Sequence, residues 1–266
     1  MSQEELSPSA ARDAFMEDVL KGLSRDQKTI PPKYFYDQVG SELFEAICLT
    51  PEYYPTRAEM SLLGEVAPAL SKWVRPECIL VEFGSGASAK TRLLLDAMPQ
   101  ITTYMPIDIS AGALGPAAAR IREAYPSIRV APVEADFTQP IAGLALNAYP
   151  AVLGFFPGST IGNFTFDEAR LFLEAARLML GGDALFLIGA DMVKEPAILE
   201  AAYDDAAGIT AAFNLNVLQR INSELGGDFV TGQFAHRARW NAAAARMEMH
   251  LESLCCLLYT SPSPRD

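Results

Sequence analysis

The sequence predicts an α/β fold with a doubly wound parallel sheet, together with a second, smaller α+β lobe. From Cys78 to Asp191, short apolar runs alternate with stretches of helical periodicity, which is typical of strand–helix–strand units. The runs CILVEF (78–83) and ALFLIGAD (184–191) are apolar almost throughout, as strands buried on both faces are. After Asp191, two helical segments and two alternating segments follow, and these predict the smaller lobe.

The segments that precede the sheet are predicted to be mostly helical. Phe15, Val19 and Leu23 share one helical face, and a second, short helix is expected from Ser41. A third helix is expected from Thr56, because Thr56-Arg57-Ala58-Glu59 has the form of a capping box.

The remaining elements follow in a regular order. Strands and helices of the sheet region are expected at 78–83 (strand), 88–98 (helix), 103–107 (strand), 111–124 (helix), 128–133 (strand), 151–156 (strand), 167–180 (helix) and 184–191 (strand). In the smaller lobe we expect helices at 194–206 and 208–223 and antiparallel strands at 228–241 and 246–253. The predicted domains are therefore a nucleotide-binding domain over 57–196 and a substrate lobe formed by 1–56 with 197–255.

Composition narrows the class of protein. A net charge of -12 disfavours binding to nucleic acid. The polar, acidic N-terminus does not resemble a signal peptide, and the longest apolar runs are too short to span a bilayer. No two of the four cysteines form a C-x-x-C pair, and nothing near His236 or His250 completes a metal site. We expect a cytoplasmic protein that binds no metal, and we also expect it to be a monomer.

A glycine-rich turn follows the first predicted strand. The segment GSGASA (84–89) matches G-x-G-x-x-A at a strand-to-helix junction. Glycines allow a tight turn and a close approach of a ligand to the backbone, and the next helix offers free N–H groups. Because many folds carry such a turn and some of these turns bind nothing, Gly84 and Gly86 by themselves indicate only a candidate nucleotide site.

Polar residues near the turn narrow the choice of nucleotide. Asp108 ends the second strand, where a carboxylate can bind two ribose hydroxyls, although it could also be a solvated strand end. Asp136 and Phe137 follow the third strand, where an acid and an aromatic ring suit an adenine. Lys90 could hold the carboxylate of a methionine moiety, or could lie on a solvated helix face. Together these residues favour S-adenosylmethionine over NAD.

Four stretches together resemble the histidine N-alpha-methyltransferases of ergothioneine biosynthesis. They are PPKYFYDQVGSELFEAI (31–47), PEYYPTR (51–57), FPGSTIGNF (156–164) and YDDAAGITAAFN (203–214). The resemblance extends from about Leu23 to Glu252. It implies a Rossmann-like methyltransferase sheet and the transfer of three methyl groups in turn from S-adenosylmethionine to the alpha-amino nitrogen of L-histidine.

The resemblance also implies two sets of site residues. For the cofactor these are Tyr36, Gly86, Lys90, Asp108, Asp136 and Phe137. For the amino acid they are Tyr53, Asn163, Tyr203, Thr210, Phe213 and Met249, the last of which would line the imidazole pocket. Tyr53, Asn163 and Tyr203 are the catalytic candidates. By their residue types alone, Tyr53 could instead brace a turn and Asn163 could cap the following helix.

These residue types suit methyl transfer to an amine. The reaction is an in-line displacement on a sulfonium, so the protein must hold a neutral amine in line and exclude water. A tyrosine hydroxyl or a water could accept the proton that the amine loses. An aromatic face such as that of Phe213 or Tyr53 suits the cationic product.

The last residues depart from the family pattern. The resemblance implies a longer C-terminal segment with a Glu-x-Ser element that binds histidine, and this sequence has no counterpart of it. Residues 256–266 can be back-translated into DNA that resembles a transposon-end sequencing adapter, so we expect a non-native tail and an incomplete histidine site. A genuine disordered tail rich in Ser and Pro is the alternative.

Three other functions stay open at this point. The same fold could act on another aromatic amino acid such as tryptophan, or the chain could be a non-catalytic module that binds the cofactor. Tyr53, Asn163 and Tyr203 disfavour the non-catalytic module, since a protein that only senses the cofactor needs no amino-acid site. An NAD-dependent oxidoreductase is the third and weakest alternative.

Overall fold

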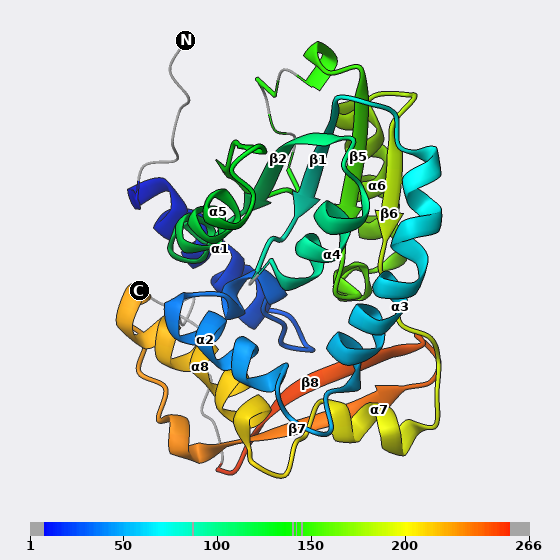
Figure 1. Cartoon of the computed structure of the whole chain (residues 1–266). Helices are drawn as coiled ribbons and strands as arrows, with labels where there is room; N and C mark the ends of the chain where they lie inside the picture. Colours follow the sequence, from blue (N-terminus) through cyan, green and yellow to red (C-terminus); the bar gives the residue numbers. More distant parts are fainter. Residues whose placement is uncertain (1–7, 87, 140, 142, 145, 256–266) are drawn as a thin grey trace. The chain divides into compact units, whose positions relative to one another are not determined.

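The computed structural model describes residues 8–255 except residues 87, 140, 142 and 145 (Figure 1). Contacts divide the chain into two compact units, Tyr53–Val193 and the combination of Met1–Glu52 with Lys194–Asp266. Each unit is described by itself below. The predicted non-native tail, residues 256–266, lies outside the described residues.

The unit Tyr53–Val193, called the sheet unit below, contains a six-stranded sheet in which every strand pair is parallel. The strands are β1 (Cys78–Phe83), β2 (Ile101–Asp108), β3 (Arg129–Val130), β4 (Val133–Glu134), β5 (Ala151–Phe156) and β6 (Leu185–Ile188). Their order is β3-β2-β1-β5-β6, and β4 also pairs with β2 (Figure 1). In place of the single strand predicted over 128–133, the structure has two short strands, β3 and β4, which both pair with β2. The α/β class is confirmed.

Helices cover both faces of this sheet. They are α3 (Tyr54–Leu70), α4 (Ala89–Ala97), α5 (Ala111–Ala124) and α6 (Phe166–Leu180), with short 3-10 segments η2 (Ser71–Trp73), η3 (Leu146–Ala148) and η4 (Thr160–Asn163). Along β1, Leu80 packs with Leu94 of α4 in one core, and Phe83 packs with Phe172 of α6 in the other. Side chains of a strand alternate between its faces, so the two cores give the doubly wound arrangement that the sequence predicts.

The capping box predicted at Thr56 and Glu59 was wrong. Helix α3 begins at Tyr54, with Pro55 in its first turn and no side chain capping it. Proline is favoured at the start of a helix, so the helix begins before Thr56. A capping box forms instead at α6, where the Thr165 hydroxyl accepts from the Glu168 N–H and the Glu168 carboxylate accepts from the Thr165 N–H.

The other unit, called the helical unit below, combines helices with a hairpin. Its elements are α1 (Pro8–Leu23), η1 (Pro32–Phe35), α2 (Gln38–Ile47), α7 (Pro196–Ala202), α8 (Ile209–Leu225), η5 (Thr231–Gln233), β7 (Phe234–Asn241) and β8 (Arg246–Ser253). Phe15 and Val19 of α1 pack with Val217 and Ile221 of α8 in one core. Strands β7 and β8 pair antiparallel and contact α7 and α8 (Figure 1).

The boundary between the units differs from the predicted one. Tyr53 and Tyr54 are predicted to belong to the substrate lobe, but both lie in the sheet unit. The reason is that α3 begins at Tyr54 and packs on the sheet through Leu63 and Ala67. None of the helices in the described part of the chain is long and apolar enough to cross a membrane.

Candidate active site

The candidate cofactor residues of the sheet unit lie at the carboxyl edge of its sheet. The strand order reverses between β1 and β5, and ligands of open parallel sheets bind at such a switch point, beyond the carboxyl ends of the strands. Gly84 and Gly86 follow β1, Asp108 ends β2, and Asp136 follows β4. The topology therefore brings together residues that are far apart in the sequence.

The glycine turn has the backbone that the sequence predicts. Gly84 has a φ of 78° and Gly86 a φ of 44°, a region that glycine adopts without strain. The Asp108 carboxylate braces this turn, because its Oδ2 accepts from the Ser85 N–H at 3.0 Å and its Oδ1 accepts from the Ser110 N–H at 3.0 Å. Asp108 is therefore half-buried and hydrogen-bonded, and the alternative of a solvated strand end is wrong.

Asp136 and Phe137 lie beside the same turn. Asp136 Oδ1 accepts from the N–H and the hydroxyl of Thr138, at 2.9 and 2.5 Å. The Phe137 ring packs edge-on against Phe83, with ring centroids 6.1 Å apart. A methyl group placed on Gly84 would lie 3.7 Å from this ring, so the aromatic side chain borders the glycine turn.

Lys90 forms an ion pair that the sequence analysis did not find. Its Nζ lies 2.5 Å from Glu59 Oε2, and both Glu59 oxygens lie 2.9 Å from the N–H of Gly158. Lys90 is largely buried, so it is not a solvated side chain on a helix face. Glu59 links α3, α4 and the loop after β5. The capping-box pattern hid this role, because it assigned the Glu59 carboxylate to a local partner.

Two further candidates lie in the sheet unit. Tyr53 is buried and occupies the N-cap position of α3. Asn163 ends η4 and is exposed. Because Thr165 caps α6, the alternative that Asn163 caps this helix is wrong. Ser159, which precedes η4, has a φ of 56°, and such strain in a residue other than glycine is often found at functional sites.

Glu82 is a buried acid in the middle of this region. It is 1% exposed, and its Oε2 accepts hydrogen bonds from the hydroxyls of Thr91, at 2.7 Å, and Tyr104. Burial raises the pKa of Glu82 to about 7, although both hydroxyls lower it. The signal in the sequence was a single acid inside the apolar run CILVEF, two residues before Gly84.

The helical unit holds the remaining candidates. Tyr36, which the resemblance assigns to the cofactor, packs edge-on against Phe213, with ring centroids 5.7 Å apart. Thr210 is the second residue of α8, and its N–H donates to Oδ1 of Asp205 at 2.7 Å. Burial of Asp205 opposes its ionisation, but hydrogen bonds from Thr210 and Ile209 outweigh this and lower its pKa. Asp205 thus caps α8 as an ionised carboxylate.

Tyr203 and Met249 come from other segments of this unit. Tyr203 is the residue after α7, and its carbonyl oxygen lies 2.7 Å from Nε2 of His236 on β7. Met249 of β8 pairs with Ala238 of β7. The helical unit therefore brings Tyr203, Phe213 and Met249 into neighbouring segments, held partly by a histidine that the sequence analysis treats as structural.

A buried hydroxyl group in the described part of the glycine turn has no partner. Within the described ranges, Ser85 Oγ is buried and makes no hydrogen bond. The buried hydroxyls of Ser88 and Thr210 interact with Tyr104 and Asp205, respectively. An unpaired buried hydroxyl is costly, so a polar group of a ligand bound at the glycine turn would satisfy Ser85. The polar groups of S-adenosylmethionine meet this requirement.

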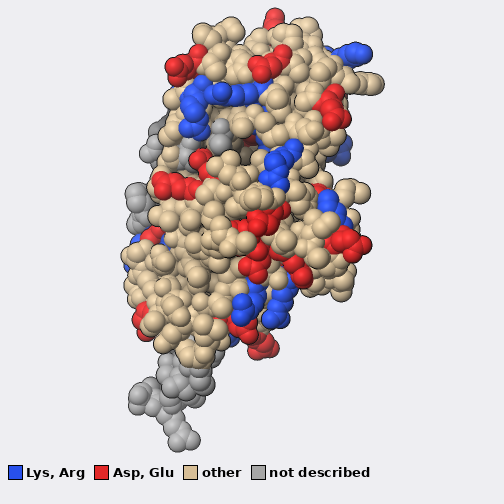
Figure 2. Space-filling view, turned by 60° about the horizontal axis from the view of Figure 1, so that its bottom comes forward, with Lys and Arg blue, Asp and Glu red and all other residues tan. Residues whose placement is uncertain are grey.

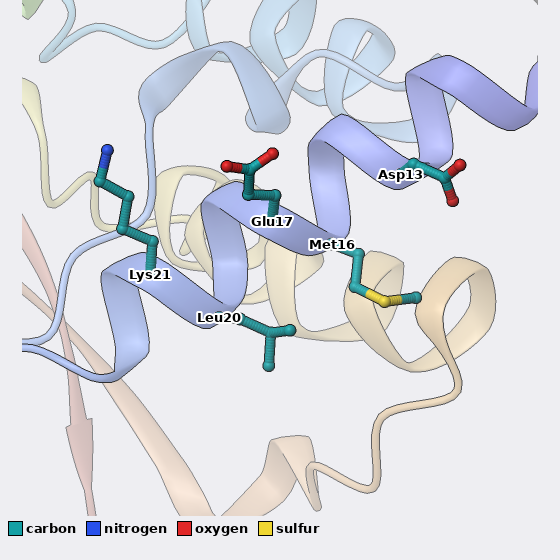
Figure 3. A pocket seen from close by; sticks show the side chains of 5 residues that line it. All are labelled: Asp13, Met16, Glu17, Leu20 and Lys21. Atoms are coloured by element: carbon teal, nitrogen blue, oxygen red, sulfur yellow. The ribbon is translucent and has the colours of Figure 1, made fainter.

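Surface hollows elsewhere contain none of the candidate residues. One, of about 510 Å³, lies along α1 and is lined by Asp13, Met16, Glu17, Leu20 and Lys21, whose side chains extend from a single helix (Figure 3). Another, of about 210 Å³, is lined by Trp73, Cys78 and Asp183, among others, near the amino ends of β1 and β5. Parallel sheets bind ligands at the opposite edge, so we assign neither hollow to the reaction.

Comparison with known proteins identifies the family. A family model described as histidine-specific methyltransferase, SAM-dependent, matches residues 15–261. The histidine N-alpha-methyltransferase of Mycobacterium tuberculosis is 43% identical over 252 residues, which are 93% of this chain and 77% of that protein. Ergothioneine biosynthesis protein 1 of Neurospora crassa is 30% identical over 206 residues, which are 75% of this chain and 23% of that protein.

Among solved structures, an O-methyltransferase family protein from Burkholderia thailandensis aligns with a TM-score of 0.43 and 14% identity, over 95% of this chain and 74% of that one. The family match and the identity to the M. tuberculosis enzyme each extend over nearly the whole chain. This chain belongs to the family of histidine-specific, S-adenosylmethionine-dependent methyltransferases.

Proposed function

We propose that this protein transfers three methyl groups from S-adenosylmethionine to the alpha-amino nitrogen of L-histidine, as a step of ergothioneine biosynthesis. Family membership supports the reaction class and the substrate. The observation on the structure that carries the proposal is the glycine turn at the carboxyl edge of the sheet, where the Asp108 carboxylate and the unpaired buried hydroxyl of Ser85 lie together.

The cofactor residues have complementary tasks. S-adenosylmethionine supplies a methyl group on a positively charged sulfur when it is bound. Each Asp108 oxygen accepts one backbone N–H, and a carboxylate oxygen can accept more than one hydrogen bond, so Asp108 can also hold the two ribose hydroxyls. Asp136 would accept from the adenine amine and Phe137 would pack against the ring. Lys90 would bind the methionine carboxylate, with Glu59 holding its ammonium group next to Gly158.

The amino-acid residues would prepare the nucleophile. An ammonium group cannot attack, so the amine must lose a proton before each transfer, and the hydroxyl of Tyr53 or Tyr203, or a water, would accept it. Asn163 offers both a donor and an acceptor to the amine or carboxylate. The Thr210 hydroxyl would bind a polar group of the substrate. Phe213 would face the nitrogen as it becomes a permanent cation, and Met249 would line the imidazole pocket.

We further propose that the protein is a cytoplasmic monomer that acts without a metal or a nucleic acid. The net charge of -12 supports the last point, because it repels phosphate backbones. Acidic and basic side chains are also interspersed on the face shown in Figure 2, so this face presents no continuous basic surface. Size-exclusion chromatography with light scattering tests the oligomeric state. A monomer would have a measured mass equal to the chain mass of 28.8 kDa, and a dimer would have twice that mass.

The test is a methylation assay with mass spectrometry. The protein is incubated with S-adenosylmethionine and L-histidine, and we expect products that carry one, two and three added methyl groups on the alpha-amino nitrogen. Parallel reactions replace histidine with tryptophan or omit the cofactor. Methylation of tryptophan but not of histidine would overturn the substrate. Tight binding of S-adenosylmethionine without any product, in a protein that also carries the C-terminal segment implied by the family resemblance, would favour a cofactor-binding module. Quenching or enhancement of NADH fluorescence would favour an oxidoreductase.

A further inference from the structure

We propose that His236 is a positioning residue for the amino-acid site. In this role a neutral imidazole with its proton on Nε2 joins the three segments that carry Tyr203, Phe213 and Met249. The inference deepens the proposed function and rests on it for the identity of the substrate. Nothing in the sequence pattern distinguishes His236 from a histidine that merely fills a core.

The imidazole is buried and bonded on both of its nitrogens. His236 is 5% exposed. Its Nε2 lies 2.7 Å from the carbonyl oxygen of Tyr203, and its Nδ1 lies 2.9 Å from Nδ2 of Asn214. Asn214, on α8, is itself 2% exposed, and its Nδ2 also donates to the carbonyl oxygen of His250 at 3.1 Å.

These partners determine where the proton of the imidazole lies. A carbonyl oxygen only accepts, so Nε2 of His236 must donate to Tyr203. The carbonyl oxygen of His250 fixes the orientation of the Asn214 side-chain amide. If this amide were rotated by half a turn, its Oδ1 would face the His250 carbonyl oxygen, and two acceptors cannot form a hydrogen bond. Nδ2 of Asn214 therefore faces Nδ1 of His236, which must accept and carries no proton. A protonated imidazole would place two donors opposite each other.

His236 lies on the face of the hairpin that carries Met249. In the antiparallel register His236 pairs with Leu251 and Ala238 pairs with Met249, and residues two positions apart share a face. The opposite face carries Arg237, Glu248 and His250, with His250 Nε2 3.1 Å from Glu248 Oε2. Only the first face presents a buried histidine to α7 and α8.

One side chain thus connects all parts of the amino-acid set in the helical unit. Its Nε2–H holds the backbone of Tyr203 at the end of α7. Its Nδ1 holds Asn214, which follows Phe213 and lies one helical turn after Thr210 on α8. Its backbone belongs to the hairpin that carries Met249. Loss of either hydrogen bond would leave a buried polar group unpaired and allow these segments to shift.

Three variants separate positioning from general stability. For His236→Phe, which keeps the size but makes neither bond, we expect the KM for histidine to rise about tenfold, as loss of a buried hydrogen bond does. We expect the Kd for S-adenosylhomocysteine to stay within about twofold of the parent, since the cofactor residues other than Tyr36 lie in the sheet unit.

His236→Gln offers one acceptor and one donor and should return the KM for histidine to within about threefold of the parent. His250→Gln, on the opposite face of the same hairpin, is the matched control and should behave as the parent.

The outcomes decide the inference. A parental KM in His236→Phe, or an equal loss in His236→Gln and His236→Phe, would overturn it. An equal rise in the KM for histidine and the Kd for S-adenosylhomocysteine would also overturn it, because that is the pattern of general unfolding. If His236→Phe does not fold, Asn214→Leu replaces it, since this change leaves Nδ1 unpaired and should raise the KM for histidine alone.

A second readout does not depend on the substrate. Long-range nitrogen–proton NMR spectra of the labelled parent protein report which imidazole nitrogen carries the proton. We expect His236 to be neutral with its proton on Nε2, and a proton on Nδ1 or on both nitrogens would overturn the inference. If this tautomer is observed and histidine is not methylated by the parent, the proposed function fails while the geometry around His236 stands.

Discussion

The two units of the molecule place their candidate residues in different ways. In the sheet unit, Gly84, Asp108 and Asp136 are brought together by the ends of adjacent parallel strands. In the helical unit, the segments that carry Tyr203 and Phe213 are connected by side-chain hydrogen bonds between residues distant in the sequence. Backbone topology follows from local periodicity, whereas such side-chain bonds do not. The first arrangement could be predicted from the sequence, and the second could not.

The difference extends to the acids of the two units. Asp108 braces a turn formed next to its own strand. Asp37 caps α2 through the N–H of Gly40 and also accepts from Asn216 of α8, 179 positions away. A carboxylate that supports a local turn is recognisable from its motif. One that connects two helices across the chain is recognisable only in the folded structure.

The largest expected effect concerns the buried Glu82 of the sheet unit. Its pKa is raised from 4.5 to about 7 by burial, so the folded state binds the proton more tightly than the unfolded chain. This contribution to stability is complete below about pH 4.5 and is lost as the pH rises to about 7, a change of about 3 kcal/mol. Glu82→Gln should remove this pH dependence, as measured by urea unfolding at several pH values.

The control for this experiment is Glu123→Gln, at an exposed position on α5. The free energy of unfolding of this variant should change with pH in the same way as that of the parent. Parallel stability curves for Glu82→Gln and the parent would mean that Glu82 ionises as freely in the folded protein as in the unfolded chain.

The next effect concerns the cofactor. In Asp108→Asn, an amide NH2 replaces one of two oxygens that each accept a backbone N–H. We expect the Kd for S-adenosylhomocysteine, measured by calorimetry, to rise about 30-fold, or about 2 kcal/mol. Asp183→Asn, an exposed acid before β6, should leave the Kd unchanged. Equal affinities for Asp108→Asn and the parent would remove Asp108 from the cofactor site.

A pair of helix caps tests the comparison between the units directly. Thr165→Ala removes a local capping box and should lower the free energy of unfolding by about 1 kcal/mol. Asp37→Ala removes a cap and also leaves the buried amide of Asn216 unpaired, so we expect about 2 kcal/mol. Urea denaturation measures both. Equal losses would show that the bond between α2 and α8 contributes nothing beyond the cap.

The smallest effect concerns the chemistry of Tyr53. Tyr53→Phe keeps the buried ring at the start of α3 but removes its hydroxyl. We expect the rate of histidine methylation to fall about fivefold, or about 1 kcal/mol, because one route for the proton is lost. The affinity for S-adenosylhomocysteine should stay near that of the parent. A matched loss of rate and cofactor affinity would instead assign Tyr53 to the support of the turn.

Several predictions from the sequence were correct because they depend on neighbouring residues. The largely apolar runs CILVEF and AVLGFF became β1 and β5, since a strand buried on both faces is mostly apolar. The helix predicted over 111–124 was found with those bounds. The glycine turn was correct because Gly84 and Gly86 tolerate a positive φ. The family was confirmed by the comparison with known proteins.

The sequence by itself therefore determined the order of the strands and helices, the parallel sheet, the glycine turn and the acids at its carboxyl edge. Only the tertiary structure decided that Glu59 pairs with Lys90 and Gly158 instead of capping its own helix. It also decided that His236 connects Tyr203 to Asn214. The physical reason is that periodicity reports which face of an element is buried, whereas the partner of a buried polar side chain is selected by whichever segment packs against it.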